Sequence, residues 1–355
     1  MNLKPFIFPD PEYVPNSWGV RELKHVQDLA APWLLELEPS MLEALNEAVW
    51  HLDRALHHPV HRQQSLQRQG LADRSMEDEG AFLCYDFHIH NGIPRLVEVN
   101  SNAGGWLICA WLAGQPMDDW IVPMIRQGWS QLRPGEQLEQ VWLVDEHPEL
   151  QFLYPEFRLY QALFERSGLR CSIVDVQQLR SRQPESGVLL YNRLTDFYLD
   201  RYPQLHLWPM LPSPSTYAVY ADKNNLVDLF AIPELSRWIL PVYPVASQSF
   251  ETWWSTRHNW FFKPMSGYGS KAVYRGERIS RKLLGELCQR NDYVAQQYCP
   301  AGVLATPEGQ LMKYDMRVYS WAGRTALISA RLYQGQVTNF RTAGGGFCVV
   351  QARKG

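Results

Sequence analysis

A lysine that precedes a glycine-rich loop, within residues 259–274, brings together groups that could bind phosphate. Lys263 ends an apolar, strand-like run, and Gly267 and Gly269 follow it closely. Glycines let backbone N–H groups approach an anion, and a lysine ammonium supplies a mobile charge beside it. The segment therefore predicts a strand, a phosphate-binding loop and a second strand that begins at Lys271.

Other nucleotide-binding loops fit this segment less well. Gly267, Gly269 and Ala272 match the dinucleotide fingerprint, but that fingerprint requires a helix at the glycines, and residues 272–276 have the character of a strand. The Walker A pattern is missing, and so are the H-R-D and D-F-G triplets of protein kinases. A glycine hairpin that folds over a nucleotide remains, with an ordinary surface hairpin as its alternative.

A hairpin earlier in the chain carries oxygen ligands suited to Mg²⁺. Residues 81–90 and 93–100 alternate like strands on either side of an Asn-Gly pair, which is a strong hairpin signal. A two-residue turn would put Asp86 on the opposite face from Glu98, whereas a three-residue loop with a left-handed glycine would bring them together. We expect the longer loop, because Asp86, Glu98 and Asn100 form an all-oxygen set that Mg²⁺ prefers. An edge hairpin with solvated charges is the alternative interpretation.

Cationic side chains gather on two later strands and at one helix start. Residues 312–322 and 325–333 alternate like strands, and each places an arginine, Arg317 or Arg331, on a face with other charged groups. Charge clustered on one face of a sheet suits a polyanion. Lys223 begins a predicted helix, where a cation opposes the helix dipole, so a bound anion would explain its position.

A strand, helix and strand pattern over residues 141–192 predicts a parallel α/β unit. Arg193 and Asp196 follow its last strand, where ligands bind in open α/β sheets. Both are candidates for the substrate pocket, with a local salt bridge as the alternative. Three successive glycines near residue 345 would cost backbone entropy without a use. The remaining substrate candidates lie in this last segment: Arg341, Gly344 and Gly345.

An amphipathic helix is predicted over residues 40–62, with a capping box formed by Ser40 and Glu43. Several histidines lie in or near this helix, and no carboxylate or cysteine stands at a metal-binding spacing from them. We expect them to lie at the solvated end of the helix rather than to bind a metal. These histidines are His51, His57, His58 and His61.

Composition excludes several classes of protein. The net charge of −3 and the scattered Lys and Arg residues show no basic stripe, so a nucleic-acid partner is not expected. The first residues lack the apolar segment of a leader, and no run is long and apolar enough for a membrane helix, so we expect a cytoplasmic protein without a membrane partner. The six cysteines lie far apart, which is typical of small core residues. A homodimer is the association state considered.

Together these residues resemble the ATP-grasp superfamily, and within it the glutathione-synthetase-like ligases. The matches cover residues 221–347, and their order is more specific than any single motif. The resemblance implies the following cofactor-binding residues: Lys223, Lys263, Ser266, Gly267, Gly269, Ser270, Gln296, Gln297, Tyr298, Cys299, Asp315 and Asn339. It implies a catalytic role for Arg317, Arg331 and Lys263.

The metal-binding hairpin of that family has its counterpart at the other end of this sequence. Family members follow the glycine loop with a helix and a hairpin that carries Asp…Glu-x-Asn, whereas here eight residues follow Phe347. The helix over 40–62, then Asp86, then Glu98 and Asn100 supply the same pieces in the same order. The chain therefore resembles circularly permuted, glutathionylspermidine-synthetase-like ligases, which implies that the two chain ends meet.

The resemblance implies an ATP-dependent ligase that joins a carboxylate to an amine, on small molecules or peptides, through an acylphosphate. ATP would lie between two α+β lobes with adenine against residues 296–299 and the two lysines on its α- and β-phosphates. Mg²⁺, with Mn²⁺ as the alternative, would be held by Asp86, Glu98 and Asn100. The two arginines would stabilise charge on the transferred phosphoryl group, and the glycine loop would close to exclude water.

The expected fold is α+β with an α/β part: a permuted ATP-grasp fold joined to a Rossmann-like pre-ATP-grasp domain. Residues 1–135 would complete the ATP-grasp core, 136–215 would form the α/β domain, 216–305 the lid subdomain, and 306–355 the core strands. Two alternative functions stay open. One is an ATP-grasp phosphotransferase, which needs no amine pocket, and the other is a catalytically silent nucleotide-binding module.

Overall fold

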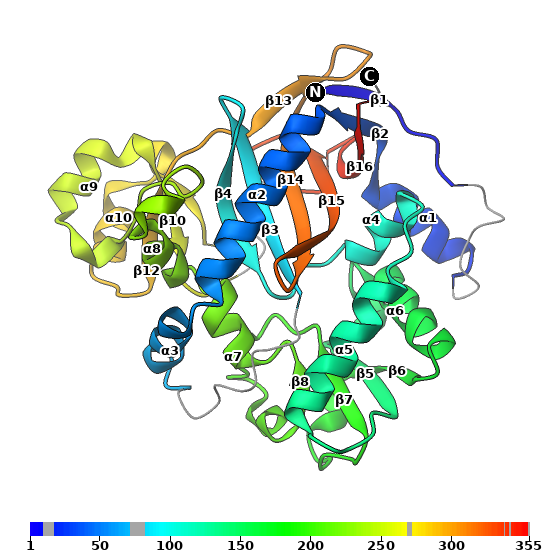
Figure 1. Cartoon of the computed structure of the whole chain (residues 1–355). Helices are drawn as coiled ribbons and strands as arrows, with labels where there is room; N and C mark the ends of the chain where they lie inside the picture. The colour runs from blue at the N-terminus through cyan, green and yellow to red at the C-terminus, as the bar shows by residue number, and fades with distance from the viewer. Residues whose placement is uncertain (10–17, 72–81, 268–271, 337, 341, 354–355) are drawn as a thin grey trace.

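The computed structural model describes residues 1–9, 18–71, 82–267, 272–336, 338–340 and 342–353. Within these residues the chain has a mixed α+β architecture built on three β-sheets, one of eight strands and two of four (Figure 1). None of the helices described is long and apolar enough to cross a lipid bilayer.

The central sheet has the strand order β1-β2-β16-β15-β14-β3-β4, with β13 paired to β14. Its neighbouring strands run antiparallel except for β16 and β2, which are parallel. Strands from the beginning and from the end of the sequence therefore lie side by side. The strands are β1 (Asn2–Pro5), β2 (Ala30–Leu37), β3 (Leu83–His90), β4 (Ile93–Asn100), β13 (Gly302–Ala305), β14 (Leu311–Trp321), β15 (Arg324–Tyr333) and β16 (Gly346–Ala352).

Helices cover both faces of the central sheet, so its strands are buried on each side. Helix α2 (Pro39–Leu56) crosses one face and contacts β4, β14 and β15 (Figure 1). Its apolar residues recur at helical spacing, which points Leu45 and Val49 into the core. The opposite face packs against α1 (Val20–Leu29) and α4 (Trp106–Leu112).

The predicted helix over residues 40–62 is present but divided. It begins at Pro39 without a capping side chain, so the predicted capping box of Ser40 and Glu43 is wrong. A second helix, α3 (Pro59–Arg68), starts at a proline, because the residue before proline avoids the helical conformation. His61 is buried and contacts a backbone carbonyl, so it does not lie at a solvated end as predicted.

The second sheet has the order β11-β10-β12-β9 and packs against α9 and α10 through a small aromatic core. The predicted strands on both sides of the glycine loop are present, although β11 begins only at Tyr274 and Lys271 lies outside the described residues. Helix α8 begins after Lys223, as predicted. The elements are α7 (Pro214–Thr216), α8 (Asn224–Phe230), β9 (Val242–Pro244), α9 (Phe250–Thr256), β10 (Trp260–Pro264), β11 (Tyr274–Arg275), α10 (Arg281–Cys288) and β12 (Tyr293–Gln297).

The third sheet, in the order β6-β5-β7-β8, is parallel throughout, which confirms the predicted parallel α/β unit. Asp145 is the last residue of β5, and Arg193 follows the last residue of β7, so both lie at the same edge of this sheet. The elements are α5 (Asp118–Leu132), β5 (Gln140–Asp145), α6 (Tyr154–Arg166), β6 (Arg170–Asp175), β7 (Val188–Asn192) and β8 (Met210–Leu211).

Candidate active site

A cavity of about 680 Å³ is lined by residues of all three sheets. Its wall includes Arg317 from β14, Glu98 from β4, Lys263 from β10 and Asp145 from β5. Segments far apart in the sequence therefore contribute to one space. The two lysines predicted to bind phosphate and the three residues predicted to bind metal all line it.

The hairpin of β3 and β4 reaches its register by a route different from the predicted one. His90 pairs with Ile93 across a two-residue turn, so the predicted three-residue loop is wrong. A β-bulge then shifts the register: Leu96 pairs with Phe87, but the next pair is Asp86 with Glu98, which leaves Val97 as the extra residue. Because the bulge restores the alternation, Asp86 and Glu98 lie opposite each other as predicted.

The lysine of the second sheet holds this bulge in place. Lys263 Nζ donates to the carbonyl oxygen of Val97 at 3.1 Å and to Gln296 Oε1 at 2.7 Å. Gln296 Nε2 in turn donates to the carbonyl oxygen of Leu96 at 3.1 Å. These contacts join the second sheet to the central sheet at the bulge. Burial of the ammonium lowers the pKa of Lys263 to about 8.

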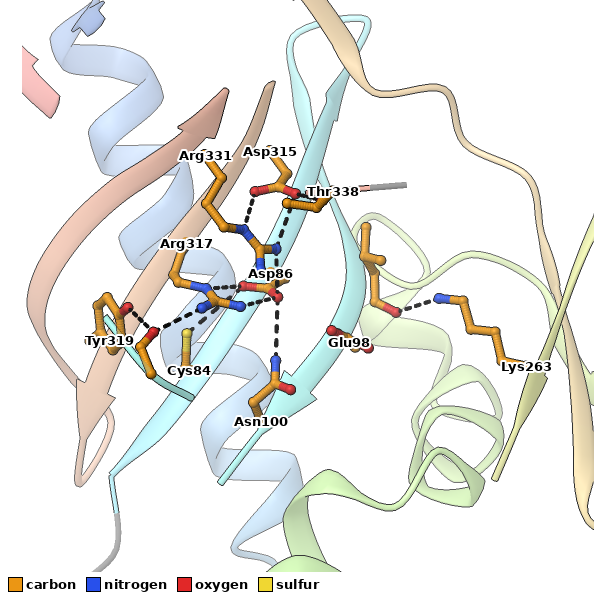
Figure 2. A network of polar contacts seen from close by, with 12 residues as sticks. Cys84, Asp86, Glu98, Asn100, Lys263, Asp315, Arg317, Tyr319, Arg331 and Thr338 are labelled. Carbon is orange, nitrogen blue, oxygen red and sulfur yellow. Dashed lines mark hydrogen bonds and ion pairs between the residues drawn. The ribbon is translucent and has the colours of Figure 1, made fainter. Parts of the chain in front are cut away.

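Asp86 is the shared counter-ion of two arginines (Figure 2). Arg317 makes a two-pronged contact with it, Nε to Oδ1 and Nη2 to Oδ2, both at 2.8 Å. Arg331 Nη2 adds a third contact to Oδ2 at 2.9 Å. Arg331 also pairs with Asp315 through Nε at 2.8 Å, and Thr338 donates to the same aspartate at 2.6 Å. Two carboxylates thus fix two guanidinium groups at the cavity wall.

The charges of this cluster depend on one another because Asp86, Asp315 and Arg317 are buried and Arg331 is largely so. Burial alone would raise the pKa of Asp86, but the guanidinium groups of Arg317 and Arg331 outweigh it and lower that pKa to about 2. Asp86 is 1% exposed, so little water competes for its oxygens. The aspartate is therefore ionised at neutral pH, and the arginines keep their full charge.

The three predicted metal ligands differ in how free their oxygens are. Both oxygens of Asp86 accept hydrogen bonds, including one from Asn100 Nδ2 at 3.3 Å. Glu98 makes no hydrogen bond among the described residues, and its side chain is 31% exposed at the cavity. Glu98 and the side-chain oxygen of Asn100 thus fit a divalent cation. A ligand role for Asp86 stays a prediction, and it requires a guanidinium group to move away.

The second predicted lysine lies beside the first. Lys223 precedes α8 and donates from Nζ to the carbonyl oxygen of Gly267 at 3.1 Å. The same Nζ is 3.9 Å from Glu98 Oε2. Lys263 lines the same cavity, so both lysines and this carboxylate border one space. Ser266 and Gly267 follow Lys263 along the chain, at the start of the glycine loop. Gly269 and Ser270 lie outside the described residues.

A loop over residues 101–105 separates the arginine cluster from the third sheet. Arg317 Nη1 donates to the carbonyl oxygen of Gly104 at 3.1 Å. On the other side, the fully buried Glu156 accepts from the amide of Gly105 at 2.9 Å, and Arg193 Nη2 lies 3.6 Å from that carboxylate. The sequence interpretation missed Glu156, because a glutamate in the first turn of a helix is usually solvated.

Gly105→Ala is expected to lower the free energy of unfolding by about 2–4 kcal/mol, because it adds a clash to backbone strain. Gly105 has φ +96°, and an added Cβ would lie 2.2 Å from Phe347 Cζ. Gly135→Ala is the matched control, since its φ is +81° but nothing lies within 4 Å of an added Cβ. Urea unfolding of both variants separates clash from strain, and equal losses would contradict the expected packing of this loop.

The other predicted site residues divide into three groups. Gln297, Tyr298 and Cys299 line the cavity, as Arg193 does. Asp196 instead accepts from backbone amides of its own loop, at 3.1 and 2.8 Å, and lies near Arg201, which matches the alternative of a local salt bridge. Three predicted residues belong to the loop before β16: Asn339 donates a hydrogen bond to the carbonyl oxygen of Gln334, and Gly344 and Gly345 pack within that loop. Arg341 lies outside the described residues.

Comparison with known proteins gives a likeness of fold. No family model matches this sequence, and no curated protein matches it. A glutathione synthetase-like effector from Globodera pallida, solved in its apo form, matches with a TM-score of 0.59 at 11% identity, over 97% of this chain and 98% of that chain. A putative gamma-glutamylcysteine synthetase from Methylobacillus flagellatus KT has a TM-score of 0.44 at 10% identity, over 87% of each chain. A shared fold with the effector is what these values establish.

Proposed function

We propose that this protein is an ATP-dependent ligase of the ATP-grasp type that joins a carboxylate to an amine. The observation that carries the proposal is the meeting of Lys223, Lys263, Arg317 and Arg331 at one cavity, although they come from distant parts of the chain. Four cations around a space of this size suit a polyphosphate. The fold shared with a protein described as glutathione synthetase-like supports the same class.

In the proposed reaction the chain's residues bind charge and exclude water. Lys223 and Lys263 would hold the α- and β-phosphates, and the adenine would lie against Gln297 and Tyr298. Arg317 and Arg331 would stabilise the phosphoryl group as a substrate carboxylate oxygen attacks it and the bond to ADP breaks. The amine nitrogen then attacks the carbonyl carbon of the acylphosphate, inorganic phosphate leaves, and the nitrogen loses a proton. Amide, ADP and phosphate result.

A divalent cation fits two of the three predicted ligands. Glu98 and the Asn100 side-chain oxygen would hold Mg²⁺ or Mn²⁺, whose chemistry here is to neutralise phosphate charge. Asp86 stays with the arginines and fixes their geometry. This arrangement assigns the two carboxylates of the hairpin different tasks, although they face each other across the strands.

We further propose that the chain is a circular permutation of the ATP-grasp arrangement. Its support is the order of the central sheet, in which the early hairpin β3–β4 completes the edge of the late strands β14 and β15. In this proposal the second sheet is the movable lid, and the third sheet is the pre-ATP-grasp domain. Both would close on the nucleotide at the cavity.

Trapping with hydroxylamine tests the proposed reaction. The protein is incubated with ATP, Mg²⁺, a panel of carboxylates and hydroxylamine, and the products are analysed by mass spectrometry. A hydroxamate together with ADP is expected, because hydroxylamine intercepts an acylphosphate. A stable phosphorylated product would instead identify a phosphotransferase, and ATP binding without either product across the panel would identify a silent nucleotide-binding module.

Glu98→Gln is expected to raise the Mg²⁺ concentration for half-maximal ADP release by about tenfold or more, since it removes a charged ligand. Folding is expected to be unchanged, because Glu98 makes no hydrogen bond among the described residues and its side chain is partly exposed. The control is Glu149→Gln, an exposed position. A Mg²⁺ titration that coincides with that of the unchanged protein would remove Glu98 from the metal site.

A further inference from the structure

Asp145 presents a carboxylate oxygen without a partner to the cavity, on the side of the third sheet. It is 8% exposed, and Oδ1 accepts from the amide of Glu146 at 2.8 Å. Among the described residues no hydrogen bond or ion pair reaches Oδ2, and Asp145 belongs to the cavity wall. A mostly buried carboxylate whose second oxygen is open to a cavity can accept a hydrogen bond from a ligand there.

The neighbouring charges do not neutralise this carboxylate. Two nitrogens of Arg193 are engaged elsewhere: Nη1 donates to Asn102 Oδ1 at 2.8 Å, and Nη2 lies 3.6 Å from Glu156, while the buried Nε has no hydrogen-bond partner among the described residues. Glu146 forms its own pair with Arg201 at 2.6 Å. Burial raises the pKa of Asp145 to about 6, although the amide of Glu146 and the charge of Arg193 lower it. Asp145 thus adds a net negative charge to this end of the cavity.

The two ends of the cavity therefore prefer opposite ligands. The end at the second sheet carries two lysines beside the arginine cluster, which favours anions. The end at the third sheet combines Asp145 with the apolar side chains of Phe152, Leu153 and Phe157. An oxygen that only accepts, in a cavity wall that also contains aromatic rings, suits an ammonium group that is attached to an apolar body.

We propose that the Asp145 pocket, defined as Asp145, Arg193, Asn102, Phe152 and Phe157, binds a primary amine in its ammonium form, with Oδ2 of Asp145 as the acceptor. The identification of this amine as the second substrate rests on the proposed ligase function. The binding itself does not, because the pocket contains its acceptor without nucleotide. Arg193 and Asn102 then act as the fixed wall that keeps the loop over 101–105 in place.

Calorimetry with n-hexylamine and n-hexanol tests the proposal without ATP, at about pH 8, where both Asp145 and the amine are charged. Hexylamine is expected to bind, and Asp145→Asn to weaken its binding by about tenfold or more, as for a hydrogen bond between charged groups. Glu146→Gln is the matched control, since it removes the adjacent charge outside the cavity wall. The affinity of this variant for hexylamine is expected to stay within about twofold of that of the unchanged protein. Hexanol is expected to bind more weakly and to be insensitive to either change.

A stability measurement distinguishes binding from a structural role. The folded pKa of Asp145 lies above that of an unfolded aspartate, so its ionisation destabilises the fold as pH rises through about 6. Asp145→Asn is therefore expected to raise the thermal midpoint at about pH 8. The groups whose charges act on Asp145 are Glu146, Asp175 and Arg193. A lowered midpoint would mean that the carboxylate is a structural group and would overturn the proposal.

Three calorimetric results would also overturn it. These are no hexylamine binding by the unchanged protein up to about 10 mM, equal binding of hexylamine and hexanol, or an equal loss in Asp145→Asn and Glu146→Gln. A failure of the hydroxylamine assay together with the expected amine binding would leave the pocket intact and refute only the ligase. The two proposals therefore fail separately.

Discussion

Asp86→Asn is expected to lower the free energy of unfolding by about 3–5 kcal/mol, because it leaves two buried guanidinium groups without their shared counter-ion. Asparagine keeps the size of the side chain, so the loss reports charge rather than a cavity. Its amide nitrogen would also face Arg317 or Arg331, since both oxygens of Asp86 accept from arginines. Chemical denaturation near neutral pH measures the effect.

Glu47→Gln is the matched control for this prediction. Glu47 also pairs with an arginine, Arg237, at 3.3 Å, but the two side chains are 46% and 51% exposed. The exposed pair is expected to contribute about 0.5 kcal/mol or less. A similar loss in both variants would mean that the buried cluster has no special weight in the stability of this fold.

The pH dependence gives a second measurement of the same contact. The folded pKa of Asp86, about 2, lies below that of an unfolded aspartate, so its contribution is present above about pH 4 and is lost as pH falls towards 2. The difference in stability between the unchanged protein and Asp86→Asn is therefore expected to shrink over this range. A constant difference would assign the loss to packing instead.

Lys263→Ala is expected to reduce ADP release by about 10²–10³-fold, the usual cost of removing one group that stabilises developing charge. Nucleotide affinity in the unchanged protein is also expected to fall as pH rises through about 8, since the lysine then loses its proton. The alanine variant lacks this charge, so its affinity is expected to be flat over the same range. Rates and ADP affinity at several pH values provide the measurement.

A second variant separates the charge of Lys263 from its structural task at the bulge. Gln296→Met removes the acceptor of the lysine and the donor to Leu96, yet it keeps the ammonium group. The loss in rate is expected to be much smaller than in Lys263→Ala. If the two losses are equal, Lys263 acts by positioning the hairpin, and its role as a phosphate-binding group is contradicted.

The sequence predicted most strands because alternation and turn residues are local signals. It also selected Lys263, Arg317 and Asp86 for one site, and the structure places all three at one cavity or its wall. The bulge at Val97 was not predicted, since an alternating pattern does not show where a strand gains an extra residue. The prediction that Asp86 and Glu98 lie opposite each other was therefore right for a wrong reason. It relied on a longer loop, whereas the bulge sets the register.

Partners of buried charges were the least predictable feature. The sequence around Glu156 does not indicate that its carboxylate accepts hydrogen bonds from the backbone amides of residues 105 and 107. These contacts join segments that lie about 50 residues apart in the sequence. Asp145 could have been found, since it ends β5 at the same sheet edge as Arg193. The rule that ligands bind where parallel strands end applies to both, but only the residue after β7 was selected.

The position of β16 has a consequence for synthesis of the chain. This strand lies between β15 and β2, and its residues 347–352 pair with residues 30–37. At about 5–20 residues per second, β2 leaves the ribosome tens of seconds before its later neighbour, β16, exists. Leu35 and Leu37, both fully buried in the finished sheet, have no such cover during that interval. The nascent amino-terminal segment is thus an expected client of ribosome-associated chaperones, and strains that lack them should accumulate this protein in aggregates.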